Sequence, residues 1–140
     1  MSVQNTMSVE RTQATMNAYI QDLVGGGRYA QHYADDVVVT LMWTDQAVRG
    51  RDAAEQMITY LHQQAFEARP VLKNLFVGQG QAVVEADFIA THTGEFAGVA
   101  ATGKAVHLPY CVVYDLEDDK ITALRLYFPI DVLLKQIDRK

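Results

Sequence analysis

Two carboxylates in this chain have surroundings that suit proton transfer. Asp87 and Asp131 can each serve as a base, and burial beside Trp43 or Tyr127 would raise the pKa of such a carboxyl group towards neutrality. Proton removal next to a carbonyl needs such a base, together with a donor that stabilises the oxygen as it gains charge. The alternative roles are structural, because Asp87 beside Glu85 fits a solvated strand position and Asp131 fits the first turn of a helix.

Two of the four histidines lie in predicted strands and can donate or accept a proton near neutral pH. His107 shares one strand face with Cys111 and Asp115, and we expect it to line a pocket. His92 stands beside the turn at Gly94, where a hydrogen-bonded structural histidine is the competing interpretation.

Aromatic side chains supply flat surface for a ring-containing ligand, although at strand or helix spacing they also fit a plain core. The residues that we predict to line a substrate pocket are Trp43, Asp87, His92, Tyr110, Tyr127 and Tyr19.

Metal and cofactor sites are not predicted. The histidines at positions 32, 62, 92 and 107 lack metal-ligand spacing, and Cys111 is the single cysteine, which we expect to be a small buried hydrophobic residue. Glycines 25–27 and the glycines of 94–103 lack the context of a phosphate loop or a dinucleotide site. We therefore expect chemistry without cofactor or metal.

Length and charge limit the class of protein. The 140 residues are 49% hydrophobic, which fits one domain over residues 1–140, with residues 1–7 as a flexible tail. A net charge of −5 argues against a nucleic-acid or anionic-membrane surface. We expect no signal peptide and no membrane span, and a cytoplasmic location.

Hydrophobic periodicity predicts helices first and long strands afterwards. The expected helices cover 8–24, 28–34, 52–69 and 130–137, and the expected strands cover 37–43, 71–77, 82–93, 106–116 and 121–128. This order predicts an α+β fold, in which an antiparallel sheet curves strongly and helices pack on one face. Such a sheet encloses a conical space whose mouth suits a small molecule.

Several segments resemble the SnoaL-like polyketide cyclase family of the nuclear transport factor 2-like (cystatin-like) superfamily. They are residues 50–54 (GRDAA), 91–96 (THTGEF), 101–104 (ATGK), 117–121 (EDDKI), 127–128 (YF) and 133–137 (LLKQI). The resemblance implies a conical roll of strongly curved sheet against N-terminal helices. It also implies a homodimer that pairs through the open face of the sheet.

The same resemblance implies a cyclase that closes a ring by cofactor-free, aldol-type acid/base chemistry on a hydrophobic carbonyl compound. The family's carboxylate position near the end of the last strand falls on Pro129, and the nearest acid is Asp131. We expect Asp131 and His107 to be the catalytic pair. Pro129 favours the alternative of a non-catalytic protein that binds small hydrophobic or aromatic ligands, and a ketosteroid isomerase-like isomerase or hydratase is a third possibility.

Overall fold

In the computed structural model, which describes residues 7–138, the first helix has both ends defined by local sequence. This helix, α1, spans Val9–Gly25, and the Ser8 hydroxyl accepts a hydrogen bond from the Arg11 N–H at 3.1 Å at its start. It ends at Gly26, whose φ of 80° reverses the chain at low cost. The helix predicted over 8–24 is confirmed. Of the predicted tail, residues 1–6 lie outside the described residues, and Met7 is buried.

The next segment turns the chain into the sheet. The short 3₁₀ helix η1 (Tyr29–His32) replaces the longer helix predicted over 28–34, and strand β1 (Tyr33–Leu41) begins earlier than predicted. Strand β2 (Ala47–Arg49) pairs antiparallel with β1 and was not predicted, because its three residues are too few for a periodic signal.

The following helix is shorter than its pattern predicts. It consists of α2 (Arg51–Thr59) and a wider turn, η2 (Tyr60–Gln64), in which the Ala65 N–H donates to the Tyr60 carbonyl at 2.7 Å. Residues predicted to finish the helix instead form strand β3 (Phe66–Ala68), which pairs with residues 90–92. Burial of Phe66 and pairing with an open strand edge outweigh helix propensity there.

Four strands after this helix build most of the sheet: β4 (Val71–Val77), β5 (Gln81–His92), β6 (Ala105–Glu117) and β7 (Lys120–Tyr127). The strand order is β2-β1-β7-β6-β5-β3, and β4 also pairs with β5. Even-numbered residues of β5 are buried from Ala82 to His92, as their alternation predicts. We call this side of the sheet the inner face and the opposite side the outer face.

One pairing departs from the predicted antiparallel sheet, because β1 runs parallel to β7. The two strands come from opposite ends of the chain, so no hairpin dictates their relative direction. The sheet is therefore mixed, and the α+β class with a strongly curved sheet is confirmed.

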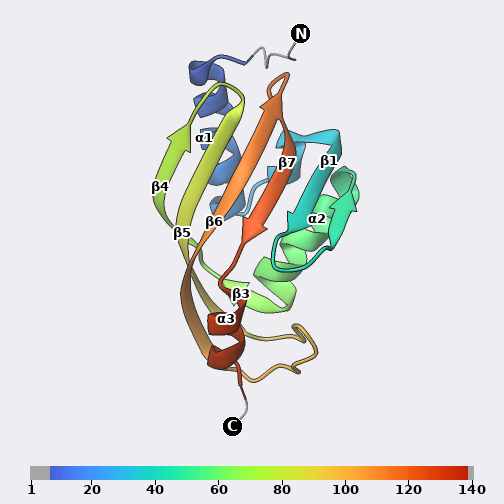
Figure 1. The fold of residues 1–140 in the computed structure, drawn as a ribbon, viewed down its shortest axis with the longest axis vertical. Helices are drawn as coiled ribbons and strands as arrows, with labels where there is room; N and C mark the ends of the chain where they lie inside the picture. Colours follow the sequence, from blue (N-terminus) through green and yellow to red (C-terminus); the bar gives the residue numbers. More distant parts are fainter. Residues whose placement is uncertain (1–6, 139–140) are drawn as a thin grey trace.

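Helices cover the inner face. Figure 1 shows α1 and α2 on the far side of the sheet and α3 (Ile130–Gln136) at the end of the molecule where the C-terminus lies. Met16 and Tyr19 of α1 and Ile58 of α2 enter the same buried cluster as the inner face of β5 to β7. Apolar burial is the dominant favourable term in folding, so the helices stabilise the curved sheet by covering its inner face.

Candidate functional site

The middle of the inner face is lined with aromatic rings. Phe88 of β5 lies at its centre, with ring centroids 5.3 Å from Phe66, 5.2 Å from Phe128 and 5.8 Å from Tyr110. Tyr110 also packs against Phe128 at 4.7 Å. Burial raises the pKa of Tyr110, so its hydroxyl stays protonated and can donate a hydrogen bond. The predicted pocket residue Tyr110 thus belongs to an aromatic interior.

A hollow of about 330 Å³ lies beside this aromatic interior. Its lining combines Trp43, Tyr60 and Phe96 with the aliphatic residues Leu41, Met57 and Leu61 and with Thr44, Gln46 and Ala97. The Trp43 ring lies 5.4 Å from the Phe128 ring, so the hollow adjoins the interior rings. We call it the mouth pocket, and it contains the predicted pocket residue Trp43.

The loop over residues 93–104 forms one wall of the mouth pocket. The Tyr60 hydroxyl donates to the Glu95 carbonyl, and Phe96 packs against Phe66 with centroids 5.1 Å apart. His92 holds the other end of this loop, because its Nδ1 accepts from the Thr102 N–H at 3.2 Å and lies 2.9 Å from the Thr102 hydroxyl. The fully buried His92 therefore fits the structural role that was one of its two interpretations.

At the other end of the inner face, buried tyrosines fill the space between α1 and the sheet. The hydroxyls of Tyr19 and Tyr33 lie 2.8 Å apart, and the ring of Tyr114 lies 5.7 Å from that of Tyr19. Burial raises the pKa of all three phenols. The predicted pocket residue Tyr19 is thus packed in the core.

His62 has a buried nitrogen that sequence reasoning did not single out. Its Nδ1 lies 2.8 Å from the Ile58 carbonyl oxygen, and its ring meets Phe88 edge to face at 6.2 Å. Its Nε2 is buried and has no hydrogen-bond partner among residues 7–138. Burial lowers the pKa of His62. One signal was available, because His62 borders the apolar stripe of the predicted helix, next to Leu61.

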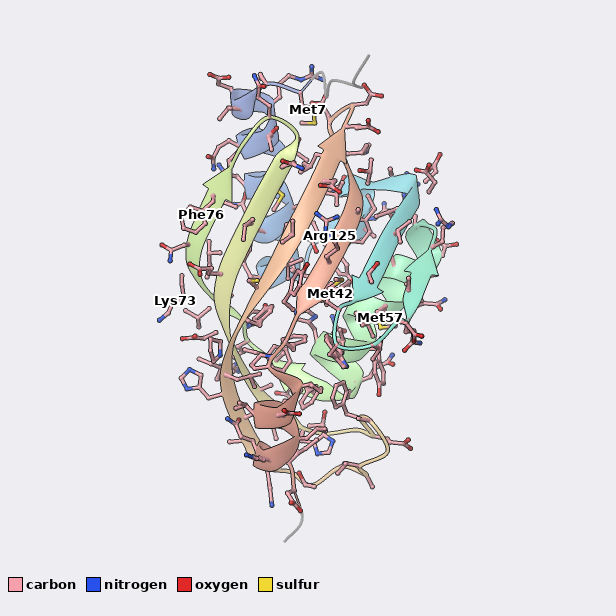
Figure 2. The ribbon with its side chains drawn as sticks, viewed as in Figure 1. Met7, Met42, Met57, Lys73, Phe76 and Arg125 are labelled. Atoms are coloured by element: carbon pink, nitrogen blue, oxygen red, sulfur yellow. The ribbon has the colours of Figure 1, made fainter. Side chains whose placement is uncertain are left out.

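The outer face carries a second group of predicted residues. The Asp87 carboxylate lies 3.3 Å from the Lys73 ammonium and 3.4 Å from Nε2 of His107. Partial burial opposes ionisation of Asp87, but hydrogen bonds from His107 and Lys73 prevail and lower its pKa. Figure 2 shows Lys73 on β4, at one edge of the sheet.

Two open hollows flank this ion pair. One, of about 490 Å³, is lined by Asp87, Tyr110 and Tyr127 among others, and the other, of about 580 Å³, includes His107 and Gln136. Three of the six predicted pocket residues therefore border the first hollow: Asp87 and Tyr127 of the outer face, and Tyr110, whose ring packs in the aromatic interior. The structure brings His107 to Asp87, both on the outer face.

Asp131 stands in the first turn of α3 with an exposed side chain. This position favours a carboxylate by its interaction with the helix dipole, as the structural interpretation expects. Within residues 7–138, no hydrogen bond or ion pair joins Asp131 to His107.

Acidic side chains are not part of the buried interior that the structure describes. The buried polar residues there are Thr12, Thr15 and His92. Across residues 7–138, no group of three or more His, Cys, Asp or Glu side chains is arranged to hold a metal ion. None of the described helices has both the length and the apolar character required to cross a membrane.

Solved structures share this architecture at low sequence identity. A proposed SnoaL-like polyketide cyclase from Jannaschia sp. CCS1 superposes with a TM-score of 0.84 at 18% identity, over 100% of this chain and 99% of that one. A proposed polyketide cyclase from Xanthomonas campestris pv. campestris gives 0.78 at 19% identity, over 93% and 98% of the two chains. A proposed ketosteroid isomerase from Kribbella flavida gives 0.68 at 17% identity, over 86% and 79%.

Sequence comparison identifies the family. None of the curated proteins matches this chain in sequence. The family model of the SnoaL-like domain matches residues 16–124, which run from the middle of α1 to the middle of β7. The chain belongs to the SnoaL-like domain family.

Proposed function

We propose that this protein is a cyclase-type enzyme that binds a small hydrophobic, ring-containing carbonyl compound in its cone and acts on it by cofactor-free acid/base chemistry. The observation that carries this proposal is the mouth pocket, which is lined by Trp43, Tyr60 and Phe96 and adjoins an aromatic interior. Flat apolar ligands gain from contact with such rings. Aldol-type ring closure and double-bond isomerisation both begin with loss of a proton next to a carbonyl.

The experiment measures that first step directly. 2-Tetralone, a bicyclic ketone, is incubated with the protein in deuterated buffer, and loss of the hydrogens next to the carbonyl is followed by NMR. We expect exchange faster than in buffer alone, and we expect Trp43→Ala to lower its rate. Val24→Ala removes an exposed apolar side chain of α1 and is the matched control. The proposal is overturned if the protein neither binds 2-tetralone nor accelerates the exchange of its hydrogens.

From the sequence we also propose Asp131 and His107 as the acid/base pair, although His107 lies on the outer face, Asp131 is exposed on α3 and neither lines the mouth pocket. The resemblance places the family carboxylate at Pro129, and Asp131 lies two residues further along the chain. His107 is oriented by Asp87. We expect Asp131→Asn and His107→Ala each to slow exchange. Full exchange in both variants would remove this pair from the mechanism while leaving ligand binding in the cone intact.

A specific observation favours a second candidate, a binding protein without catalysis. Proline at position 129 carries no acid, and the buried polar residues that the structure describes include no carboxylate. In that case calorimetry would detect binding of 2-tetralone, but exchange would proceed at the rate of buffer alone.

We also propose that two copies pair through the outer face. We propose a cytoplasmic location as well, because a reducing compartment suits the lone Cys111. Apolar side chains on that face are exposed, among them Phe76 at 55%, Val71 at 46% and Tyr127 at 41%. Figure 2 shows Phe76 on β4 and Arg125 in the middle of the sheet, on the side away from the helices. Apolar groups on an open sheet face gain from being covered. Light scattering that shows a monomer at micromolar concentration would exclude this dimer.

A further inference from the structure

The tautomer of His62 follows from its backbone contact. Nδ1 lies 2.8 Å from the Ile58 carbonyl oxygen, and a carbonyl can only accept, so Nδ1 carries the hydrogen. In a neutral imidazole the other nitrogen, Nε2, then holds an unshared pair and acts as an acceptor. The lowered pKa of His62 agrees with a neutral ring.

This acceptor lies in an unusual place. Nε2 is buried and has no hydrogen-bond partner within residues 7–138, although buried polar groups in native proteins are nearly always paired. The residue belongs to the π-helical turn η2, and such turns occur frequently at functional sites. Leaving an acceptor buried and unpaired costs stability, so a donor that reached it would bind with a corresponding gain.

The aromatic interior connects this acceptor to the mouth pocket. The His62 ring contacts Phe88, Phe88 contacts Phe128, and Phe128 contacts Trp43, with centroids separated by 6.2, 5.2 and 5.4 Å. A planar ligand that enters beside Trp43 and displaces rings along this series would bring its far end towards His62.

We propose that Nε2 of His62 accepts a hydrogen bond from the hydroxyl group of the ligand, which makes the preferred ligand a planar enol or phenol. The inference rests on the proposed function, because it uses the same cone and the same entrance. It adds the chemical group that the site recognises and the side chain that recognises it.

The test compares two probes that differ in one donor. 2-Naphthol carries a hydroxyl group, and 2-methoxynaphthalene has the same rings without a donor. We expect calorimetry to show that 2-naphthol binds roughly tenfold more tightly than 2-methoxynaphthalene, because a single hydrogen bond to a desolvated acceptor gives a gain of this size. We expect His62→Asn to remove this preference, because its amide can still donate to the Ile58 carbonyl but places no acceptor at the position of Nε2.

Controls separate this inference from the proposed function. His32→Gln changes a histidine that pairs with Asp22 outside the cone, and we expect it to keep the preference. If both probes bind equally well to the wild-type protein, the inference is overturned while the proposed function stands. If neither probe binds, both are overturned.

A measurement on the unaltered protein keeps the test decisive if His62→Asn does not fold. Side-chain ¹⁵N NMR should show His62 protonated on Nδ1, with an Nε2 resonance that moves on addition of 2-naphthol and stays in place with 2-methoxynaphthalene. An Nε2 resonance that 2-naphthol leaves unchanged would refute the hydrogen bond.

Discussion

The side-chain amide of Gln136 on α3 makes two hydrogen bonds to the backbone of His107 on β6. Its Oε1 accepts from the His107 N–H at 2.7 Å, and its Nε2 donates to the His107 carbonyl at 2.9 Å. Pairing between β6 and β7 ends at Cys111, so the backbone of His107 lies at an edge of β6 that β7 does not cover. At this edge the Gln136 amide makes the hydrogen bonds that a neighbouring strand would make. This contact holds α3 beside the outer-face residue His107.

Gln136→Ala should therefore loosen α3. Two solvent-exposed neutral hydrogen bonds are lost, and we expect unfolding to require about 1 kcal/mol less, measured by urea denaturation. Lys135→Ala changes the neighbouring exposed position and is the matched control. An unchanged urea midpoint for Gln136→Ala would mean that burial of Leu133 and Ile137 alone holds the helix.

Gly94 lies where the 93–104 loop touches the end of η2. A Cβ atom at this position would lie 2.3 Å from the Gln64 carbonyl oxygen. Gly94→Ala must displace backbone, and we expect a loss of about 2 kcal/mol in the free energy of unfolding. Gly25→Ala is the control, because its Cβ would meet nothing within 4 Å and should leave stability equal or slightly higher. Equal midpoints for the two variants would contradict the close approach.

The sequence predicted the sheet best in the strands where apolar and polar residues alternate over many positions. In β5 and β6, inward residues such as Val84, Phe88 and Leu108 are buried as expected, because a strand of twelve or thirteen residues repeats its signal several times. Strand β3 was missed because Phe66 continues the apolar period of the preceding helix. The parallel pairing of β1 with β7 joins distant segments, which local patterns do not encode.

The candidate site was predicted only in part. Trp43 and Tyr110, predicted as pocket residues, lie in the mouth pocket and among the interior rings, whereas Asp87 and His107, predicted separately, meet on the outer face. Which face of a strand is covered by helices depends on tertiary packing, so the pattern did not reveal that Asp87 and His107 face outward. The buried Nε2 of His62 depends on a widened helical turn that no local spacing signals.

The buried tyrosines should make the protein sensitive to alkali. Burial raises the pKa values of Tyr19, Tyr33 and Tyr114 in the folded state, so above about pH 10 the unfolded chain loses phenol protons first. Stability is then fully present below pH 10 and falls as the pH rises, by up to about 1.4 kcal/mol per unit for each phenol. Urea midpoints across this range, with tyrosinate absorbance rising only on unfolding, check the prediction. Tyrosinate that forms while the protein stays folded would contradict it.

His62 should make the protein sensitive to mild acid, with the opposite sign. Burial lowers its pKa in the folded state, so below about pH 6.5 the unfolded chain binds a proton that folded His62 resists. This contribution to stability is complete above pH 6.5 and declines as the pH falls, by up to about 1.4 kcal/mol per unit, until the folded pKa is reached.

The measurement for His62 is a difference between two proteins. Urea midpoints of the wild-type chain and of His62→Asn are compared between about pH 5 and pH 7, a window above the ordinary range of carboxyl groups. Subtraction cancels titration at the other histidines, so the wild-type protein should lose more stability than the variant as the pH falls. Parallel curves would mean that His62 takes up its proton as easily in the folded state as in the unfolded chain, which its buried Nε2 argues against.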